Sequence, residues 1–126
     1  MKSTSYLLTR LAIGMSFFGH GVVRMPKLAA FSKGMVGEFQ KSYLPEALVL
    51  PFSYVLPFAE LIVGVLLLAG VFTRQAAIAG AIVMILLIFG TTTIENWNIL
   101  PTQLLHVAFL VVVVEFYKPA PARAGA

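Results

Sequence analysis

Polar and charged residues divide the chain into four long apolar segments. These segments cover residues 5–23, 48–72, 75–94 and 99–117, and very few ionisable side chains lie inside them. About 20 consecutive apolar residues are enough for an α-helix to cross the hydrocarbon core of a bilayer. The pattern therefore predicts four membrane-spanning helices, arranged as an all-α integral membrane four-helix bundle.

A different pattern covers residues 27–43, between the first and second apolar segments. Leu28, Phe31, Met35 and Phe39 recur there at intervals of three or four residues, while charged residues occupy the other faces. This periodicity predicts an amphipathic helix that lies at the membrane interface. Two roles remain open for it, because it would either cover the end of the bundle or form a lid over a cavity.

The composition supports a membrane protein with one domain. Hydrophobic residues make up 60% of the 126 residues and charged residues only 11%, whereas soluble domains average about 25% charged residues. The longest connection, residues 24–47, is too short to fold independently. We therefore assign residues 1–126 to a single membrane domain in contact with lipid. A cleaved signal peptide at the N-terminus is disfavoured, because Arg10 and the run from Gly19 to Gly21 interrupt its apolar core.

The sequence excludes several kinds of chemistry. It contains no cysteine, so this chain alone cannot provide a thiolate nucleophile, a disulfide exchange centre or an iron–sulfur site. A redox role would therefore require a bound cofactor or a partner subunit. The net charge of +4 is dispersed among the loops, which argues against nucleic-acid binding and favours contact with anionic lipid headgroups.

The basic residues bear on the orientation of the chain in the membrane. Four lie toward each face: Lys2, Arg74, Lys118 and Arg123 on one, and Arg24, Lys27, Lys33 and Lys41 on the other. The positive-inside tendency is therefore balanced. An even number of spans places both termini on the same side, and we favour the cytoplasmic side for them.

Glu60 is the main candidate functional residue, because it lies inside the second apolar segment. An ionised group at the centre of a membrane helix costs about 2.5 to 3.5 kcal/mol or more, so it needs a partner, a wet cavity or a proton. Pro57 lies about one turn earlier and leaves the backbone carbonyl of Ser53 without its usual donor. We expect Arg10 or Lys27 to form a structural ion pair with Glu60.

Two histidines are predicted to lie near Glu60 in depth. At about 1.5 Å per helical residue, His20 and His106 fall in the same half of the membrane as Glu60 and the amphipathic segment. Histidine and a buried carboxyl group can exchange protons with a reducible ring such as a quinone, so all three are candidate catalytic residues. Simpler roles remain open, namely headgroup contact for His20 and a helix–helix hydrogen bond for His106. No metal site is predicted, because the three residues come from different helices without ligand spacing.

Other residues complete the predicted bundle and the predicted cofactor site. Small residues allow membrane helices to approach closely, and the glycines expected to do so are Gly14, Gly21 and Gly64. An apolar slot for a quinone is expected beside the polar groups. Its predicted lining consists of Phe17, Phe18, Phe58, Glu60 and His106.

Two sequence motifs resemble the DoxX family of small bacterial membrane proteins. The first is R-x-x-x-G from Arg10 to Gly14, followed by Gly19-His20-Gly21 and Lys27. The second is E-x-x-x-G-x-x-L-L-x-G-x-x-T-R, from Glu60 to Arg74. The resemblance covers the first three apolar segments and fades in the fourth. It implies a four-helix membrane fold in the bacterial inner membrane, with Arg10, Lys27, Glu60 and Arg74 at matching positions.

The resemblance also implies two kinds of function. Some members are subunits of thiosulfate:quinone oxidoreductases, and others accompany systems that detoxify quinones and catechols. Direct thiosulfate oxidation does not fit a chain without cysteine. We therefore expect a quinone-associated redox subunit or accessory with a polar pocket around Glu60, whose activity, if any, is that of a quinone-linked oxidoreductase subunit. The alternative is a non-catalytic structural subunit that stabilises a larger membrane complex.

Overall fold

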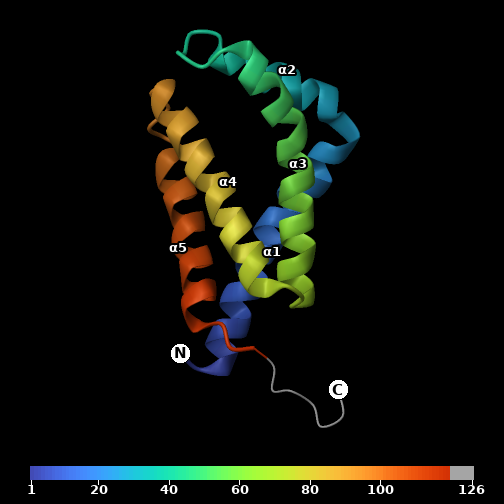
Figure 1. The fold of residues 1–126 in the computed structure, drawn as a ribbon, viewed down its shortest axis with the longest axis vertical. Coiled ribbons are helices and arrows are strands. Elements are labelled where there is room, and N and C mark those ends of the chain that lie inside the picture. The colour runs from blue at the N-terminus through green and yellow to red at the C-terminus, as the bar shows by residue number, and fades with distance from the viewer. Residues whose placement is uncertain (120–126) are drawn as a thin grey trace.

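The computed structural model describes residues 1–119 as a bundle of α-helices (Figure 1). Helix α1 is followed by a short 3-10 helix, η1, and α2 then leads into α3, α4 and α5. The bounds are α1 Ser3–Arg24, η1 Met25–Lys27, α2 Leu28–Phe39, α3 Glu46–Ala69, α4 Thr73–Thr93 and α5 Leu100–Phe116. The four apolar segments of the sequence correspond to α1, α3, α4 and α5, and the amphipathic segment corresponds to η1 and α2.

Helix ends differ from the sequence prediction by a few residues, for identifiable reasons. Helix α3 ends at Ala69 instead of residue 72, because Gly70 adopts the left-handed conformation with φ of 73° and closes the helix. Helix α2 ends at Phe39 instead of residue 43. The residues after Phe39 form a turn that leads to Pro45. Proline disfavours helical conformation in the residue before it, so the chain reaches Pro45 without helix.

The bundle consists of two helix pairs and one capping helix. Helix α1 packs mainly on α3, and α4 packs mainly on α5. Figure 1 shows the N-terminus and the end of α5 at one end of the bundle and α2 across the other end. Helix α2 is therefore positioned over the space between the two pairs.

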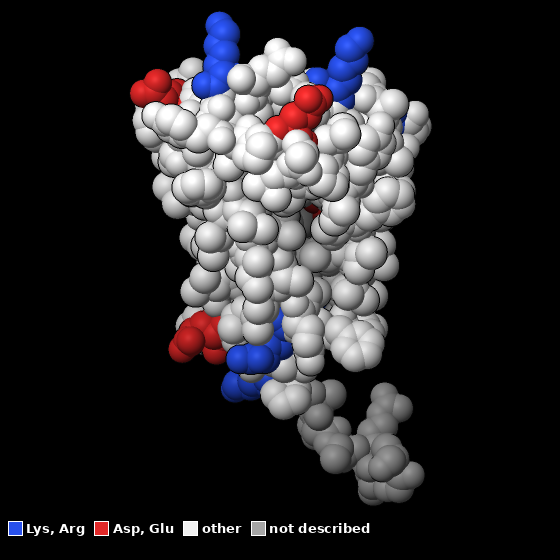
Figure 2. All heavy atoms as spheres, turned by 45° about the horizontal axis from the view of Figure 1, so that its top comes forward, with Lys and Arg blue, Asp and Glu red and all other residues white. Residues whose placement is uncertain are grey.

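The surface is that of a membrane protein. Within residues 1–119, three helical runs are long and apolar enough to cross a membrane, namely Ser3–Phe39, Glu46–Ala69 and Thr73–Thr93. Helix α5 has 17 residues and is a shorter apolar helix, so its role as a fourth span stays a prediction. On the face drawn in Figure 2, charged side chains gather at the two ends and an almost uncharged band separates them. The predicted all-α membrane bundle is confirmed.

Helices α1 and α3 approach each other at three glycines. A Cβ atom added to Gly21 would lie 2.6 Å from the backbone nitrogen of Leu61, and one added to Gly14 would lie 3.0 Å from the Cβ of Leu67. A Cβ atom on Gly64 would overlap the backbone of Phe18. The glycines predicted for helix packing thus lie at a contact within the chain, where a larger residue would push α1 and α3 apart.

Helix α2 is held to the bundle by a polar contact and an aromatic contact. The Oγ atoms of Ser32 and Ser53 are 2.5 Å apart, and both residues are buried. The Ser53 hydroxyl donates to the carbonyl oxygen of Leu50 at 2.6 Å, so the Ser32 hydroxyl must donate to Ser53. At the other end of α2 the Phe39 ring lies against Gly90 of α4. These contacts fix α2 as the roof of a cavity.

Candidate functional site

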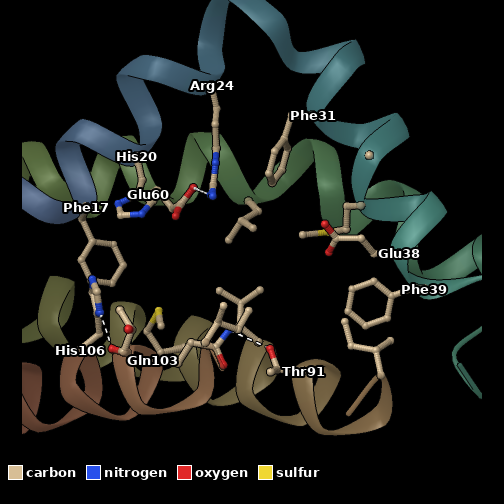
Figure 3. A pocket seen from close by; sticks show the side chains of 18 of the residues that line it. Phe17, His20, Arg24, Phe31, Glu38, Phe39, Glu60, Thr91, Gln103 and His106 are labelled. Atoms are coloured by element: carbon tan, nitrogen blue, oxygen red, sulfur yellow. Dashed lines mark hydrogen bonds and ion pairs between the residues drawn. The ribbon is translucent and has the colours of Figure 1, made fainter. Parts of the chain in front are cut away.

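A cavity of about 510 Å³ lies beneath α2 and between the helix pairs (Figure 3). Its volume falls in the range of small-molecule sites, about 300 to 1,000 Å³. All five α-helices contribute to its wall. Apolar side chains such as Phe17, Leu56 and Met84 form much of the lining, while a few polar side chains from different helices converge on it. The cavity is therefore shaped for an apolar molecule with a small number of polar groups.

The central polar feature of the cavity is an ion pair between Arg24 and Glu60. Arg24 Nη1 donates to Glu60 Oε1 at 2.6 Å, and the Glu60 side chain is only 7% exposed. The Arg24 guanidinium also stacks on Phe31 of α2, with Cζ 4.3 Å from the ring centroid. Glu60 therefore has a charged partner inside an apolar bundle, as an intramembrane carboxylate requires.

The expectation that Arg10 or Lys27 pairs with Glu60 is wrong. Lys27 is exposed in η1, outside the cavity lining. Arg10 lies near the opposite end of α1, where its guanidinium packs against Gly70. Gly70 caps the C-terminus of α3, an end of the helix dipole that favours a cation.

The reason that Arg24 meets Glu60 is the register of α1 on α3. Gly21 packs directly on Leu61, the residue after Glu60, and Arg24 follows Gly21 by one helical turn on the same face. The guanidinium is thereby brought to the carboxylate. The sequence carried this signal, since Arg24 shares a stripe with Gly14 and Gly21, but sequence analysis grouped Arg24 only with the basic residues toward one membrane face.

His106 is held in one tautomer by two hydrogen bonds. Its Nδ1 lies 2.8 Å from the carbonyl oxygen of Thr102, which can only accept, so Nδ1 carries the proton of the neutral ring. Its Nε2 then accepts from the hydroxyl of Ser16 at 2.7 Å. The ring also meets Phe17 edge-on, with centroids 6.0 Å apart. His106 therefore links α5 to α1.

His20 lies beside His106 and keeps one ring nitrogen for other partners. Its Nδ1 donates to the carbonyl oxygen of Ser16 at 2.7 Å, and its ring centroid is 6.1 Å from that of His106. Nε2 of the neutral ring is therefore an acceptor at the edge of the cavity. His20, Glu60 and His106 all line this cavity, so the structure brings the three candidate residues together.

The aromatic lining differs from the sequence prediction. Of the three phenylalanines expected, only Phe17 lines the cavity. The backbone of Phe18 packs on Gly64, and Phe58 is 45% exposed on the outer face of α3. Phe31 and Phe39 of α2 line the cavity instead. The α2 aromatics were identified from sequence as the apolar face of an interfacial helix, without a role in the site.

The wall formed by α4 and α5 carries a polar pair that sequence reasoning missed. The Nε2 of Gln103 donates to the Oγ1 of Thr91 at 2.8 Å, and both residues line the cavity. The Oε1 of Gln103 is buried and has no hydrogen-bond partner among the described residues. Neither residue stands out in sequence, because a polar side chain near a helix end is usual.

Within residues 1–119 no group of three or more histidine and acidic side chains is placed to hold a metal ion. Glu60 is paired with Arg24, and both histidines donate Nδ1 protons to backbone carbonyls. The polar groups of the cavity therefore suit hydrogen bonding to an organic ligand.

The structure accounts for several residues of the two sequence motifs. In the first, Gly14 allows close packing on α3 and Arg10 packs against Gly70. In the second, Glu60 binds Arg24 and Gly64 admits the backbone of Phe18. Thr73, which begins α4, is buried. The motifs therefore describe the α1–α3 contact, its ion pair and the turn that follows.

Comparison with known proteins gives one match. The sequence profile of the family described as DoxX matches residues 5–93, which span α1 to the end of α4. No curated protein and no solved structure matches the chain. Because the matched region covers well over half of the chain and contains both motifs, the protein belongs to the DoxX family.

Proposed function

We propose that the protein binds a quinone in the α2-roofed cavity and acts as a quinone-associated subunit or accessory of a membrane redox system. The observation that carries this proposal is the Arg24–Glu60 pair, set with two histidines in the wall of an otherwise largely apolar cavity. We further propose that the protein lies in the bacterial inner membrane with both termini on the cytoplasmic side. A quinone dissolved in the bilayer would then reach the cavity from lipid.

The residues present fit a quinone ring. Phe17, Leu56 and Met84 offer apolar contact to the ring, and the cavity volume of about 510 Å³ accommodates it. The Arg24 guanidinium has further N–H groups to donate to a ring oxygen. When bound, a quinone supplies two-electron, two-proton chemistry. The electrons would come from a partner redox protein, because the chain has no cysteine and its own polar groups carry protons only.

The chain's residues are arranged to hold protons near the ring. Glu60 accepts from Arg24 through Oε1, which leaves Oε2 as an acceptor. His20 presents Nε2 at the cavity edge, where it would accept a proton from the ring. The His106 ring, which lies beside that of His20, accepts a hydrogen bond from Ser16. Arg24, Glu60 and His20 would thus keep proton donors and acceptors beside the bound ring.

The alternative role as a structural subunit loses part of its basis. It rested on Gly14, Gly21 and Gly64 as surfaces for close contact with a partner helix. All three glycines are used within the chain, at the contact between α1 and α3. A partner would therefore have to bind another surface.

Replacing Glu60 with glutamine is expected to remove most of the quinone that copurifies with the protein. Glutamine keeps the size of the side chain but loses the charge that fixes Arg24 in place. Loss of a charge-assisted hydrogen bond costs about 1.5 to 3 kcal/mol, so the bound fraction should fall about tenfold or more. The measurement is mass spectrometry of the lipid extract after mild detergent purification, expressed as quinone per protein.

The matched control is Glu115→Gln, because Glu115 is exposed near the opposite end of α5. This variant should retain the wild-type amount of quinone. Equal quinone content in wild type and Glu60→Gln would contradict a site centred on Glu60. Wild-type protein that carries no quinone, and binds none when it is added, would reject the proposal itself.

A further inference from the structure

The buried and the exposed residues of the cavity lining lie on different helices. On α3 and α4 most lining side chains are buried, namely Leu56, Glu60, Met84 and Thr91. Contact with the cavity therefore adds little accessible surface, and lining residues that are exposed mark where the cavity opens outward. These exposed residues are His20 of α1, Ala30, Gly34 and Glu38 of α2, Ile99 just before α5, and Thr102 of α5.

The cavity is closed between α2 and α4. Cζ of the Phe39 ring lies 3.0 Å from the position of a Cβ atom on Gly90, and Gly90 is buried. The hydrogen bond between Ser32 and Ser53 holds the neighbouring edge of α2 on α3. A ligand could leave on this side only if Phe39 moved away from α4.

The edge of α2 toward α5 is open and is made of small residues. Ala30 and Gly34 are four residues apart, so they lie on the same face of the helix. Apart from the neighbouring part of its own helix, nothing among the described residues lies within 4 Å of a Cβ atom at Gly34. Helix α2 packs mainly on α3. A passage therefore lies between this edge and Ile99, which is also exposed and lines the cavity.

The passage lies near the membrane surface. Helix α2 crosses this end of the bundle, and Lys33 on its outer side is exposed (Figure 1). Trp97, in the connection before α5, is 55% exposed, and tryptophan is enriched at the membrane–water interface. Below the passage, Leu104 and Leu105 of α5 are exposed. A hydrocarbon chain that left the cavity here could turn into the lipid along α5.

The polar anchor of the cavity is close to the passage. Arg24 binds Glu60 and stacks on Phe31 of α2. Gly34 follows Phe31 by about one helical turn. A substituent on a ring held at the ion pair would therefore reach the passage. Because Gly34 and Ile99 present no polar side chain there, the passage suits a hydrocarbon substituent.

We propose that the ligand is a quinone with a long hydrocarbon tail, and that the tail leaves the cavity between Gly34 and Ile99. This inference rests on the proposed function, and it adds the kind of substituent on the ring and the place where that substituent crosses the wall. The Arg24–Glu60 pair would bind the ring. Gly34 would keep the passage wide enough for the tail, so it would determine whether tailed quinones bind.

The test compares a tailed and a tail-free ligand with the same ring on wild type and Gly34→Leu. The leucine side chain would occupy the passage and leave the Arg24–Glu60 pair in place. Affinities for decylubiquinone and for dimethoxymethylbenzoquinone are measured with the full chain in lipid nanodiscs, by filtration and chromatographic quantification of bound ligand, with empty nanodiscs as the blank. Gly34→Leu should weaken binding of decylubiquinone about tenfold or more, and binding of the tail-free ring by less than about threefold.

The matched control is Gly37→Leu, which makes the same change on the same helix outside the cavity lining. A Cβ atom at Gly37 also has nothing within 4 Å apart from the neighbouring part of its own helix. Leucine favours the helix over glycine, so neither variant should unfold α2. Gly37→Leu should bind both ligands as wild type does.

Three results would overturn the inference while leaving quinone binding intact. They are equal weakening of both ligands in Gly34→Leu, unchanged binding of both in that variant, and a loss of decylubiquinone binding in Gly37→Leu as large as that in Gly34→Leu. Wild-type protein that binds the tail-free ring but not decylubiquinone would overturn it as well. Absence of binding of either ligand to wild type would reject the proposed function together with the inference.

Discussion

Replacing Arg24 with methionine is expected to destabilise the protein by about 3 to 5 kcal/mol. The reason is that Glu60 would keep its carboxylate while losing its only charged partner within the described residues. Removing one member of a buried ion pair leaves the other charge uncompensated, which typically lowers the free energy of unfolding by about 3 to 5 kcal/mol. Arg24 is 26% exposed and Glu60 7%, so the penalty arises mainly from the carboxylate. Reversible unfolding in mixed detergent micelles, followed by circular dichroism, measures the loss.

Two further variants separate the ion pair from general effects of charge removal. Lys27→Met changes an exposed cation a few residues away and should alter the free energy of unfolding by less than about 1 kcal/mol. The double variant Arg24→Met/Glu60→Gln removes both charges and should be more stable than Arg24→Met alone. Equal costs for the Arg24 and Lys27 variants, or simple additivity in the double variant, would contradict the pairing seen here.

The sequence was sufficient for the bundle and for the main polar residues of the site. Apolar segments of membrane-spanning length and the periodicity of residues 27–43 depend on local pattern, which a single chain displays fully. His20, Glu60 and His106 could be grouped because helix rise converts sequence position into depth. The three packing glycines followed from their shared helix faces.

The partners of these residues could not be predicted, because they depend on the register of each helix along its neighbour and on its rotation about its own axis. Arg24 rather than Arg10 meets Glu60 since Gly21 sets the register of α1 against α3. The same rotation turns Phe58 outward and leaves Phe17 in the cavity. Gln103 and Thr91 become a pair only through the contact of α4 with α5. Depth separates Arg10 from Arg24, but it does not specify the contacts that depend on helix rotation.

Replacing Gly64 with alanine is expected to destabilise the bundle by about 1 to 3 kcal/mol, and a leucine there should cost more. A methyl group at this position would overlap the backbone of Phe18, which cannot move aside as a side-chain tip can. The overlap can be relieved only if α1 and α3 move apart. Overpacking of this kind typically destabilises a protein by about 1 to 3 kcal/mol. The Arg24–Glu60 bond joins the same two helices, so quinone content should fall as well.

Gly19→Ala is the matched control for Gly64→Ala, because it adds the same methyl group to a helix of the same pair. Apart from the neighbouring part of its own helix, nothing among the described residues lies within 4 Å of a Cβ at Gly19. Alanine favours the helix over glycine by up to about 1 kcal/mol, so this variant should be neutral or slightly stabilising. Both variants are measured by unfolding in mixed micelles and by quinone content after purification. If the two glycine variants are equally stable, close packing at Gly64 does not hold α1 against α3. A stable Gly64→Ala protein with wild-type quinone content would also show that the cavity tolerates movement of α1, contrary to a site built on its register.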